Sequence, residues 1–532
     1  MDMNVVLVFA ALVMIAAIFA SRISSRSGIP MLLVFMALGM AAGVDGFLGI
    51  EFADYDITNS VCSAALIFIM FYGGFGTSWK AARKTALPSL LLSFPGTIST
   101  ALLTGVFCHF AFSMEWLDAM LLGSVLSSTD AATVFSILRS RRLSLKYGTS
   151  SLLEMESGSN DPAAYMLVII FLSVRQSGSL SFLSILYSIF SQIVYALITG
   201  ALLAYAAWRL VKKFSFPEGF TPIFVLAVAI LSYALPSLIG GNGYLSAYLA
   251  GIILGNLKLE GKKDLVSFFN AFNGMMQILI FFLIGLLSTP SELPGQIPMG
   301  LLISLFMILI ARPLTVAILT LPFHFPWRQQ VVISAAGLRG ASSIVFAIVV
   351  TVAGGYTYGS IFNTVFFVVL VSLLVQGTLL PFIAVKVKMI DEEEDVLKTF
   401  TDYEESSIEF IPLELDGDSD WASRKIRDIS LPPSSIVAAI ERNDATLVPK
   451  GDTVLEKGDK LILALTKPDI QTNVSLSEES VGKDHPWNGK MLRDIKSKDL
   501  ILMILRDGKT IIPSGSTEIR KGDVLVKNTS HV

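Results

Sequence analysis

The chain has 532 residues, of which 53% are hydrophobic and 16% charged, and its mean hydropathy is +0.66. Because soluble domains carry about 25% charged residues, this composition argues against an ordinary soluble enzyme. Residues 1–390 hold 21 Lys and Arg against 15 Asp and Glu, whereas residues 391–532 hold 19 against 28. An apolar body of net charge +6 therefore precedes an acidic tail of net charge −9. The two cysteines, Cys62 and Cys108, lie in apolar runs without metal-ligand spacing, which argues against a disulfide framework.

Apolar segments long enough to cross a bilayer follow one another through the body. A membrane helix needs about 20 mostly apolar residues, because its backbone polar groups must be satisfied within the segment. The sequence predicts thirteen such helices and hence an all-α polytopic membrane domain over residues 1–390. The segments are 4–21, 29–49, 57–76, 86–112, 117–138, 150–173, 182–208, 220–236, 238–256, 267–288, 298–322, 329–354 and 359–385.

Lysine and arginine alternate between the loops that join these segments. Every second loop is basic and together these loops carry 18 Lys and Arg, whereas Arg175 stands alone in the loops on the other side. Basic loops stay on the cytoplasmic side of a membrane. The pattern places the N-terminus outside and the tail in the cytoplasm, and it supports the count of thirteen.

Ionisable residues within the predicted helices are candidates for function, because a charge near the bilayer centre is costly. The candidates are Asp130, Glu154, Glu156, Asp161, Arg312 and Arg339. Four of them are carboxylates on two neighbouring segments, a composition of hard oxygen ligands that suits a cation. Burial favours the neutral form of a carboxyl group, so such a group can exchange a proton for a cation near neutral pH. The alternative is that these acids are paired struts that hold helices together.

Two of the predicted helices are interrupted. Gly337–Gly340, with Arg339 between two glycines, interrupts the twelfth segment, and the polar run Ser127–Asp130 interrupts the fifth. Secondary transporters often unwind helices at the middle of the membrane, where the freed backbone groups meet the ion. The fifth and twelfth segments lie seven helices apart, which fits two inverted six-helix repeats joined by one linker helix. Arg312 either pairs with a carbonyl at a helix kink or is a second ion-pair arginine.

These motifs resemble the NhaP-type branch of the monovalent cation:proton antiporter-1 family. The resemblance rests on Ser128–Ala131, on the run from Glu154 to Pro162 with its Asn160–Asp161 pair, and on Gly337–Gly340. It covers the whole membrane body. It implies a homodimer in which the broken helices rock between inward and outward openings, and it implies a transporter rather than an enzyme.

The resemblance assigns roles to individual residues. Asp161 would bind either a proton or the cation, and Asn160 stands where electrogenic relatives place a second aspartate, so exchange would be electroneutral. Asp130, Thr129 and Ser157 would complete the site for the monovalent metal ion.

Four further residues receive structural or secondary assignments. Glu156 would pair with Arg339 across the helix crossing, and Glu154 and Ser128 are additional candidates for the site.

One position departs from the family pattern. Many members carry an acidic residue late in the third segment, where this chain reads Tyr72-Gly73-Gly74. The missing carboxylate leaves the choice between K+ and Na+ open.

The tail contains an internal repeat. Trp421–Ile429 aligns with Trp487–Ile495 at an offset of 66, and Arg442 aligns with Arg506 at an offset of 64. Short β-branched runs alternate with Gly-Asp turns in each copy, which predicts small α+β domains. We assign residues 391–402 to an acidic linker, 403–470 to a first domain and 471–532 to a second.

The repeated domains resemble TrkA-C, the C-terminal domain of regulators of K+ conductance. By resemblance such domains dimerise and bind small regulatory ligands, among them cyclic di-AMP, although a passive dimerisation module is an alternative. The chain has no glycine-rich dinucleotide fingerprint.

The sequence therefore predicts a secondary antiporter of a bacterial inner membrane that exchanges K+, or alternatively Na+, for H+ and serves pH homeostasis. The TrkA-C resemblance favours K+. No cofactor and no nucleic-acid partner are expected. A ligand-gated cation channel is the main rival, but a channel needs several weak sites in file. An intramembrane enzyme is disfavoured because HExxH, GxSxG and phosphate-loop motifs are absent from the sequence.

Overall fold

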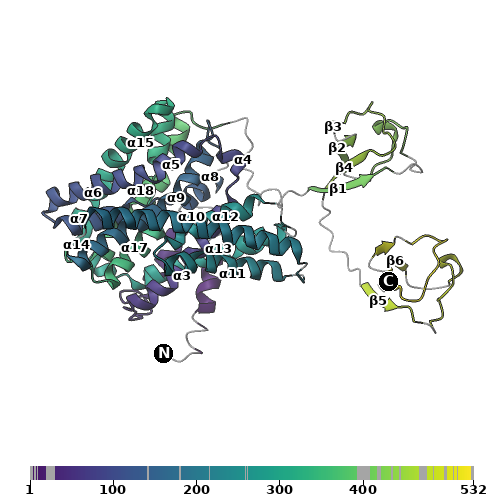
Figure 1. The fold of residues 1–532 in the computed structure, drawn as a ribbon, viewed down its shortest axis with the longest axis horizontal. Helices are drawn as coiled ribbons and strands as arrows, with labels where there is room; N and C mark the ends of the chain where they lie inside the picture. Colours follow the sequence, from purple (N-terminus) through teal and green to yellow (C-terminus); the bar gives the residue numbers. More distant parts are fainter. Residues whose placement is uncertain are drawn as a thin grey trace. The chain divides into compact units, whose positions relative to one another are not determined.

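The computed structural model forms two compact units, residues 1–405 and 406–532. It describes residues 4, 8, 10–19, 30–140, 143–178, 181–214, 216–217, 219–257, 259, 262–391, 408–415, 421–432, 435–442, 445–447, 449–466, 476–482, 485–495, 500–506, 509–511 and 513–528. The first unit is built from helices and the second from small sheets (Figure 1). The predicted fold class, a polytopic helical body followed by strand-containing tail domains, is confirmed.

A helix, or a pair of consecutive helices, lies in each of the thirteen predicted segments. After Ala10–Phe19 the helices are α2 (Met31–Ala42), α3 (Tyr55–Gly76), α4 (Trp79–Ala82), α5 (Ala86–Ser93), α6 (Pro95–Phe112), α7 (Trp116–Ser127), α8 (Ala131–Ser140), α9 (Thr149–Ser177), α10 (Phe182–Lys213), α11 (Phe220–Leu238), α12 (Gly243–Asn256), α13 (Lys262–Leu287), α14 (Leu293–Phe306), α15 (Arg312–Thr320), α16 (Trp327–Ala335), α17 (Ala341–Val352) and α18 (Ile361–Lys386). Within the described residues, seven helical stretches are long and apolar enough to cross a membrane by length and composition. The interrupted pairs α7/α8 and α16/α17 consist of shorter helices.

Side-chain caps define where several of these helices begin. Asp54, Asn242 and Ser360 precede α3, α12 and α18, and their side chains accept hydrogen bonds from the backbone N–H groups three residues later. Each cap satisfies one of the donors that the first turn of a helix leaves without a partner.

The helices pack into two bundles. We call α2, α3 and α10–α13 the scaffold bundle, because α3 packs on α12, α2 on α13, and α10 and α11 on α12. We call α5–α9 and α14–α18 the core bundle, in which α7 packs on α6 and α9, and α18 on α14 and α17. The two bundles meet where α9 contacts α12 and where α17 contacts α3.

Backbone contacts at glycines hold the scaffold bundle together. A Cβ atom at Gly74 of α3 would lie 2.1 Å from the carbonyl oxygen of Tyr248 in α12. A Cβ atom at Gly285 of α13 would lie 2.2 Å from the carbonyl oxygen of Met36 in α2. Both distances are far below van der Waals contact, so only glycine allows these helices to approach so closely.

The tail unit contains two four-stranded antiparallel sheets with the same topology. The first has the order β1-β4-β2-β3, from Ile408–Glu414, Ser435–Arg442, Ala445–Leu447 and Lys460–Thr466 for β1 to β4. The second has the order β5-β8-β6-β7, from Leu476–Ser480, Leu500–Arg506, Lys509–Ile511 and Val524–Asn528 for β5 to β8. A register shift occurs at Val437/Ala439 in one sheet and at the matching Ile501/Met503 in the other. The repeat read from the sequence is thus a repeat of structure.

An arginine–aspartate pair recurs in each sheet. Arg442 donates two hydrogen bonds of 2.7 Å to the carboxylate of Asp459, and Arg506 donates bonds of 2.7 and 2.8 Å to Asp523. Both aspartates are buried, and their carboxylates also accept a backbone N–H from the preceding turn. The hydrogen-bonded guanidinium group keeps the pKa of each aspartate below its usual value.

These two pairs make the stability of the tail depend on pH. A group with a lowered folded-state pKa stabilises the fold above its unfolded pKa, and this stabilisation is lost as the pH falls through the folded-state value. We expect the thermal unfolding midpoint of a fragment spanning residues 406–532 to fall as the pH drops below about 4. Asp523→Asn should lower the free energy of unfolding of the second domain by about 2 kcal/mol at neutral pH, because it weakens a charge-assisted pair. Calorimetry over a pH series measures both effects, and a variant as stable and as pH-sensitive as the parent would contradict them.

Candidate cation site

The two interrupted helices cross each other and are joined by one backbone–backbone hydrogen bond and one bond from a side chain to the backbone. The backbone N–H of Asp130 donates to the carbonyl oxygen of Leu338 at 2.8 Å, and the guanidinium group of Arg339 donates to the carbonyl oxygen of Ser128 at 2.9 Å. Each interruption ends one helix and begins another, which leaves backbone groups without partners in their own helix. The crossing supplies some of these partners, so each interruption stabilises the other.

Gly340 permits the closest approach at the crossing. A Cβ atom there would lie 2.3 Å from Oδ2 of Asp130. Any other residue would therefore push the carboxylate away, which explains why the interruption of the twelfth segment ends in glycine.

Asp130 caps the helix that follows it. Its Oδ1 accepts the backbone N–H of Thr133 at 3.2 Å, and its Oδ2 accepts the hydroxyl of Thr133 at 2.6 Å. A negative charge at this end of α8 also complements the helix dipole. The carboxylate lines the cavity described below, so its predicted part in the ion site stays a prediction.

Asp161 lies on α9, facing both interrupted helices. Its Oδ1 accepts hydrogen bonds from Ser128, which follows α7, and from Ser342 at the start of α17, the latter at 3.0 Å. The two serine hydroxyls are 2.7 Å apart. The carboxylate is therefore bonded to both crossing elements at once, although only 5% of the residue is exposed. Sequence reasoning did not identify Ser342, although its position two residues after Gly340 could have indicated it.

Asn160 and Ser157 both hold Thr129, and Ser157 also lines the cavity described below. The Asn160 amide donates to the Thr129 hydroxyl and accepts the Thr129 backbone N–H at 3.4 Å. Ser157 donates to the carbonyl oxygen of Thr129 at 2.7 Å. The structure thus brings the predicted site residues together. The polar atoms just named of Thr129, Asn160 and Ser157 are engaged in hydrogen bonds with one another.

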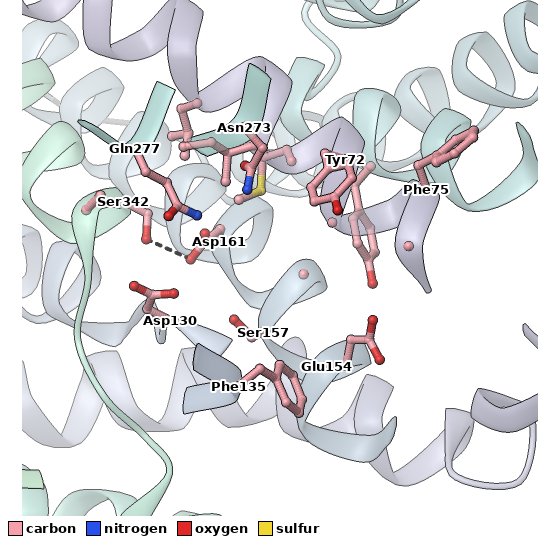
Figure 2. Close-up of a pocket in the computed structure, with 18 of the residues that line it drawn as sticks. Tyr72, Phe75, Asp130, Phe135, Glu154, Ser157, Asp161, Asn273, Gln277 and Ser342 are labelled. Atoms are coloured by element: carbon pink, nitrogen blue, oxygen red, sulfur yellow. Dashed lines mark hydrogen bonds between the residues drawn. The ribbon is translucent and has the colours of Figure 1, made fainter. Parts of the chain in front are cut away.

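A cavity of about 440 Å³ separates the two bundles beside Asp161. Asp130, Glu154, Ser157, Asp161 and Ser342 supply polar groups on the core side, as Figure 2 shows. The scaffold side contributes the polar side chains of Tyr72, Lys262, Asn270, Asn273 and Gln277. Thr129, Asn160 and Ser128 are not among the lining residues. Among the described residues, no group of three or more His, Cys, Asp or Glu side chains has a metal-binding arrangement.

The predicted ion pair between Glu156 and Arg339 is wrong. Glu156 pairs with Arg312, whose Nη2 lies 2.5 Å from Oε1, and both side chains are buried. Arg339 instead holds the carbonyl oxygen of Ser128, as described above. A π-helical turn, Met307–Ala311, immediately precedes Arg312. Such a turn shifts the phase of a helix, which a regular helical periodicity does not anticipate. The two alternatives for Arg312 are thereby resolved in favour of the ion-pair arginine.

The crossing of two interrupted helices beside a buried carboxylate is typical of secondary transporters. Residues 10–386 match the family model described as the transmembrane sodium/hydrogen exchanger, and residues 413–472 and 476–526 match the TrkA-C domain. The chain belongs to the sodium/hydrogen exchanger family and carries two TrkA-C domains. It is therefore a transporter, and both resemblances drawn from the sequence are confirmed.

Relatives and solved structures agree with this assignment. The chain is 36% identical to the K(+)/H(+) antiporter NhaP2 of Shewanella sp. (strain ANA-3), over 86% of this chain and 81% of that protein. It is 34% identical to the K(+)/H(+) antiporter NhaP of Alkalimonas amylolytica, over 90% and 84%. The sodium proton antiporter MjNhaP1 from Methanocaldococcus jannaschii has the same fold, with a TM-score of 0.65 at 22% identity over 73% of this chain and 99% of that one.

The buried pair leads to a stability prediction. Arg312→Ala leaves Glu156 buried without its cationic partner, so we expect the free energy of unfolding to fall by about 3–5 kcal/mol. The double variant Glu156→Gln, Arg312→Met removes both charges and should recover part of this loss. Thermal unfolding of the purified protein in detergent measures both, with Arg328→Ala as a control at an exposed arginine. Equal unfolding temperatures for Arg312→Ala and Arg328→Ala would contradict the assigned pair.

Proposed function

We propose that this chain exchanges a monovalent cation, K+ in preference to Na+, for H+ by alternating access, with Asp161 as the carboxylate that binds either one. The observation that carries the proposal is the position of Asp161. It joins both interrupted helices through Ser128 and Ser342 and borders the cavity between the bundles. A change in what Asp161 binds therefore acts directly on the elements that must move.

Competition at one carboxylate supports electroneutral exchange. The neighbouring residue is the amide Asn160, whose side chain bonds to Thr129. With a single titrating group, one proton replaces one monovalent cation. In this proposal Thr129, Asn160 and Ser157 fix the backbone of the interruption, and Asp130 and Glu154 give the cavity its negative charge.

The preference for K+ rests on the relatives and on the cavity. Two K(+)/H(+) antiporters share 34–36% identity with the chain, whereas the Na(+)/H(+) antiporter NhaS2 of Synechocystis sp. (strain ATCC 27184 / PCC 6803 / Kazusa) shares 26% over 61% of each chain. The cavity wall at Gly73 carries no carboxylate. A site with fewer fixed charges favours the larger and more weakly hydrated ion.

The distribution of basic residues supports an inward-facing conformation. The cavity lining extends from Asp161 to Gly76, Glu154 and Lys262. These three positions lie near basic loops, which we assign to the cytoplasm because such loops stay inside. The N-terminus would then lie outside and the tail inside a bacterial inner membrane, where a homodimer would serve pH homeostasis.

A direct test is proton movement in everted vesicles, followed with a pH-sensitive dye while K+, Na+ or Li+ is added. Asp161→Asn cannot be deprotonated, so we expect cation-dependent dequenching to vanish. Asp264→Asn changes an exposed aspartate at the start of α13 and should leave exchange intact. Full exchange by Asp161→Asn would refute the assigned carboxylate. K+ flux driven only by the membrane potential, without proton movement, would favour the channel reading.

We also propose that the tail regulates exchange through a backbone link at the end of the membrane unit. Leu145 and Ile390 form an isolated antiparallel β-bridge. The N–H of Lys146 donates to the carbonyl oxygen of Met389 at 2.9 Å, and the N–H of Asp391 donates to the carbonyl oxygen of Ser144 at 3.0 Å. The chain that leads to the tail is thereby tied to the loop between α8 and α9. Asp130 immediately precedes α8, and Asp161 lies on α9. A small ligand at the TrkA-C domains, such as cyclic di-AMP, could act along this path.

Removal of the link should uncouple the tail. Deletion of residues 392–532 should change the pH or cation dependence of exchange, and Lys146→Pro should reproduce that change because proline lacks the N–H that bonds Met389. Lys146→Ala retains the N–H and is the matched control. The same vesicle assay over a pH series measures all three, and normal regulation in Lys146→Pro would exclude this path.

A further inference from the structure

Amide side chains form a stripe along α13 on the scaffold side of the cavity. Asn270, Asn273 and Gln277 follow one another at spacings of three and four residues and all line the cavity. Residues at these spacings share one face of a helix. Asn270 accepts a hydrogen bond from the Tyr72 hydroxyl at 3.2 Å, which anchors one end of the stripe to α3.

Asn273 presents an oxygen atom that lacks a partner. Its Oδ1 is buried and accepts no hydrogen bond from any residue that the structure describes. A buried acceptor without a partner is costly, and native proteins retain few of them. The Asn273 side chain lines the cavity, and a half-turn of its amide group would direct this oxygen into the cavity, where it has the chemistry of a cation ligand.

Gln277 and Asn273 face the carboxylate that the exchange depends on. Figure 2 shows Asp161 and Ser342 on one side and the amide groups of Gln277 and Asn273 directed toward them from the other. Asp161 and Ser342 belong to the core bundle, and both amides belong to the scaffold bundle. A cation held between them would therefore contact both bodies at once.

We propose that the amide oxygens of Asn273 and Gln277 are cation ligands that complete the site opposite Asp161 and set the preference for K+. This inference rests on the proposed function and adds ligands and selectivity to it. Neutral amide oxygens coordinate a cation without adding charge, so the carboxylates of the core side balance the ion. The number and field strength of such oxygens distinguish K+ from Na+.

The position of the ligands also explains how the site tolerates the absent carboxylate of the third segment. Gly73 lines the same cavity and contributes no side chain to it. The amide oxygens of the scaffold wall therefore come from α13, beside the hydroxyl groups of Tyr72 and Tyr248. Ion binding through α13 would respond to the relative movement of the two bundles, because the amides and Asp161 lie on opposite bodies.

The test is the dependence of exchange on cation concentration in everted vesicles at fixed pH. For Asn273→Ala we expect the K+ concentration at half-maximal exchange to rise about tenfold, with the maximal rate changed by less than about twofold. A tenfold change corresponds to about 1.4 kcal/mol of binding free energy. The ratio of K+ to Na+ half-saturation should move toward one, and Gln277→Ala should shift it in the same direction.

Matched variants separate ligation from folding. Asn273→Gln and Asn273→Ser retain a side-chain oxygen and should keep part of the K+ affinity, whereas Ser267→Ala changes an exposed position on α13 outside the cavity and should behave as the parent. If Asn273→Ala does not fold, the K+ dependence of thermal stability in purified Asn273→Ser and Gln277→Ala gives the same comparison.

The possible outcomes separate a failure of the amide ligands from a failure of the proposed exchange function. Unchanged half-saturation and an unchanged K+ to Na+ ratio in both alanine variants, in a protein that exchanges normally, would overturn the amide ligands alone. Absence of cation-dependent proton movement in the parent protein would overturn the proposed function, and the inference with it.

Discussion

The constraint on which the site depends is that a chain within a membrane must satisfy every backbone polar group from its own atoms. Two helices of this protein are interrupted, and each interruption supplies hydrogen-bond partners for backbone groups of the other. The backbone N–H of Asp130 donates to the carbonyl oxygen of Leu338, and the Arg339 side chain donates to the carbonyl oxygen of Ser128. Because the two breaks satisfy each other, they hold a fixed geometry, and Asp161 can bond both through Ser128 and Ser342.

The sequence was sufficient to locate the breaks and the carboxylate. Polar residues or glycines that interrupt an otherwise apolar segment can be recognised in the amino-acid sequence, as can a rare carboxylate such as Asp161. The pairing of Glu156 with Arg312 was not predictable, because the π turn at Met307–Ala311 changes the direction in which Arg312 points. The sequence also did not identify Asn273 and Gln277 as candidate site residues. Their amides carry no charge that would mark them within a membrane helix, and only the packing of α13 opposite α9 and α17 gives them a role.

The internal repeat of the tail shows how far periodic patterns extend such reasoning. Both copies form the same sheet, and Arg442–Asp459 recurs as Arg506–Asp523. The copies nevertheless differ within their cores. Leu463 of the first sheet corresponds to Lys527 of the second, which bonds Glu479 and lies 3.9 Å from the ring centre of Trp487. His485 contacts the same glutamate at 3.0 Å. A repeat in sequence therefore predicts the shared fold but not the chemistry that each copy has acquired.

The glycine contacts of the scaffold bundle have a mechanical consequence. Where Gly74 meets the backbone of Tyr248, and Gly285 that of Met36, the main chains touch with no side chain between them. Side-chain layers can yield by changing rotamers, whereas two main chains in contact have nothing to rearrange. The scaffold is thus stiff where these helices meet. Displacements on the scale of an ion's diameter are more readily taken up at the side-chain-lined cavity between the two bundles.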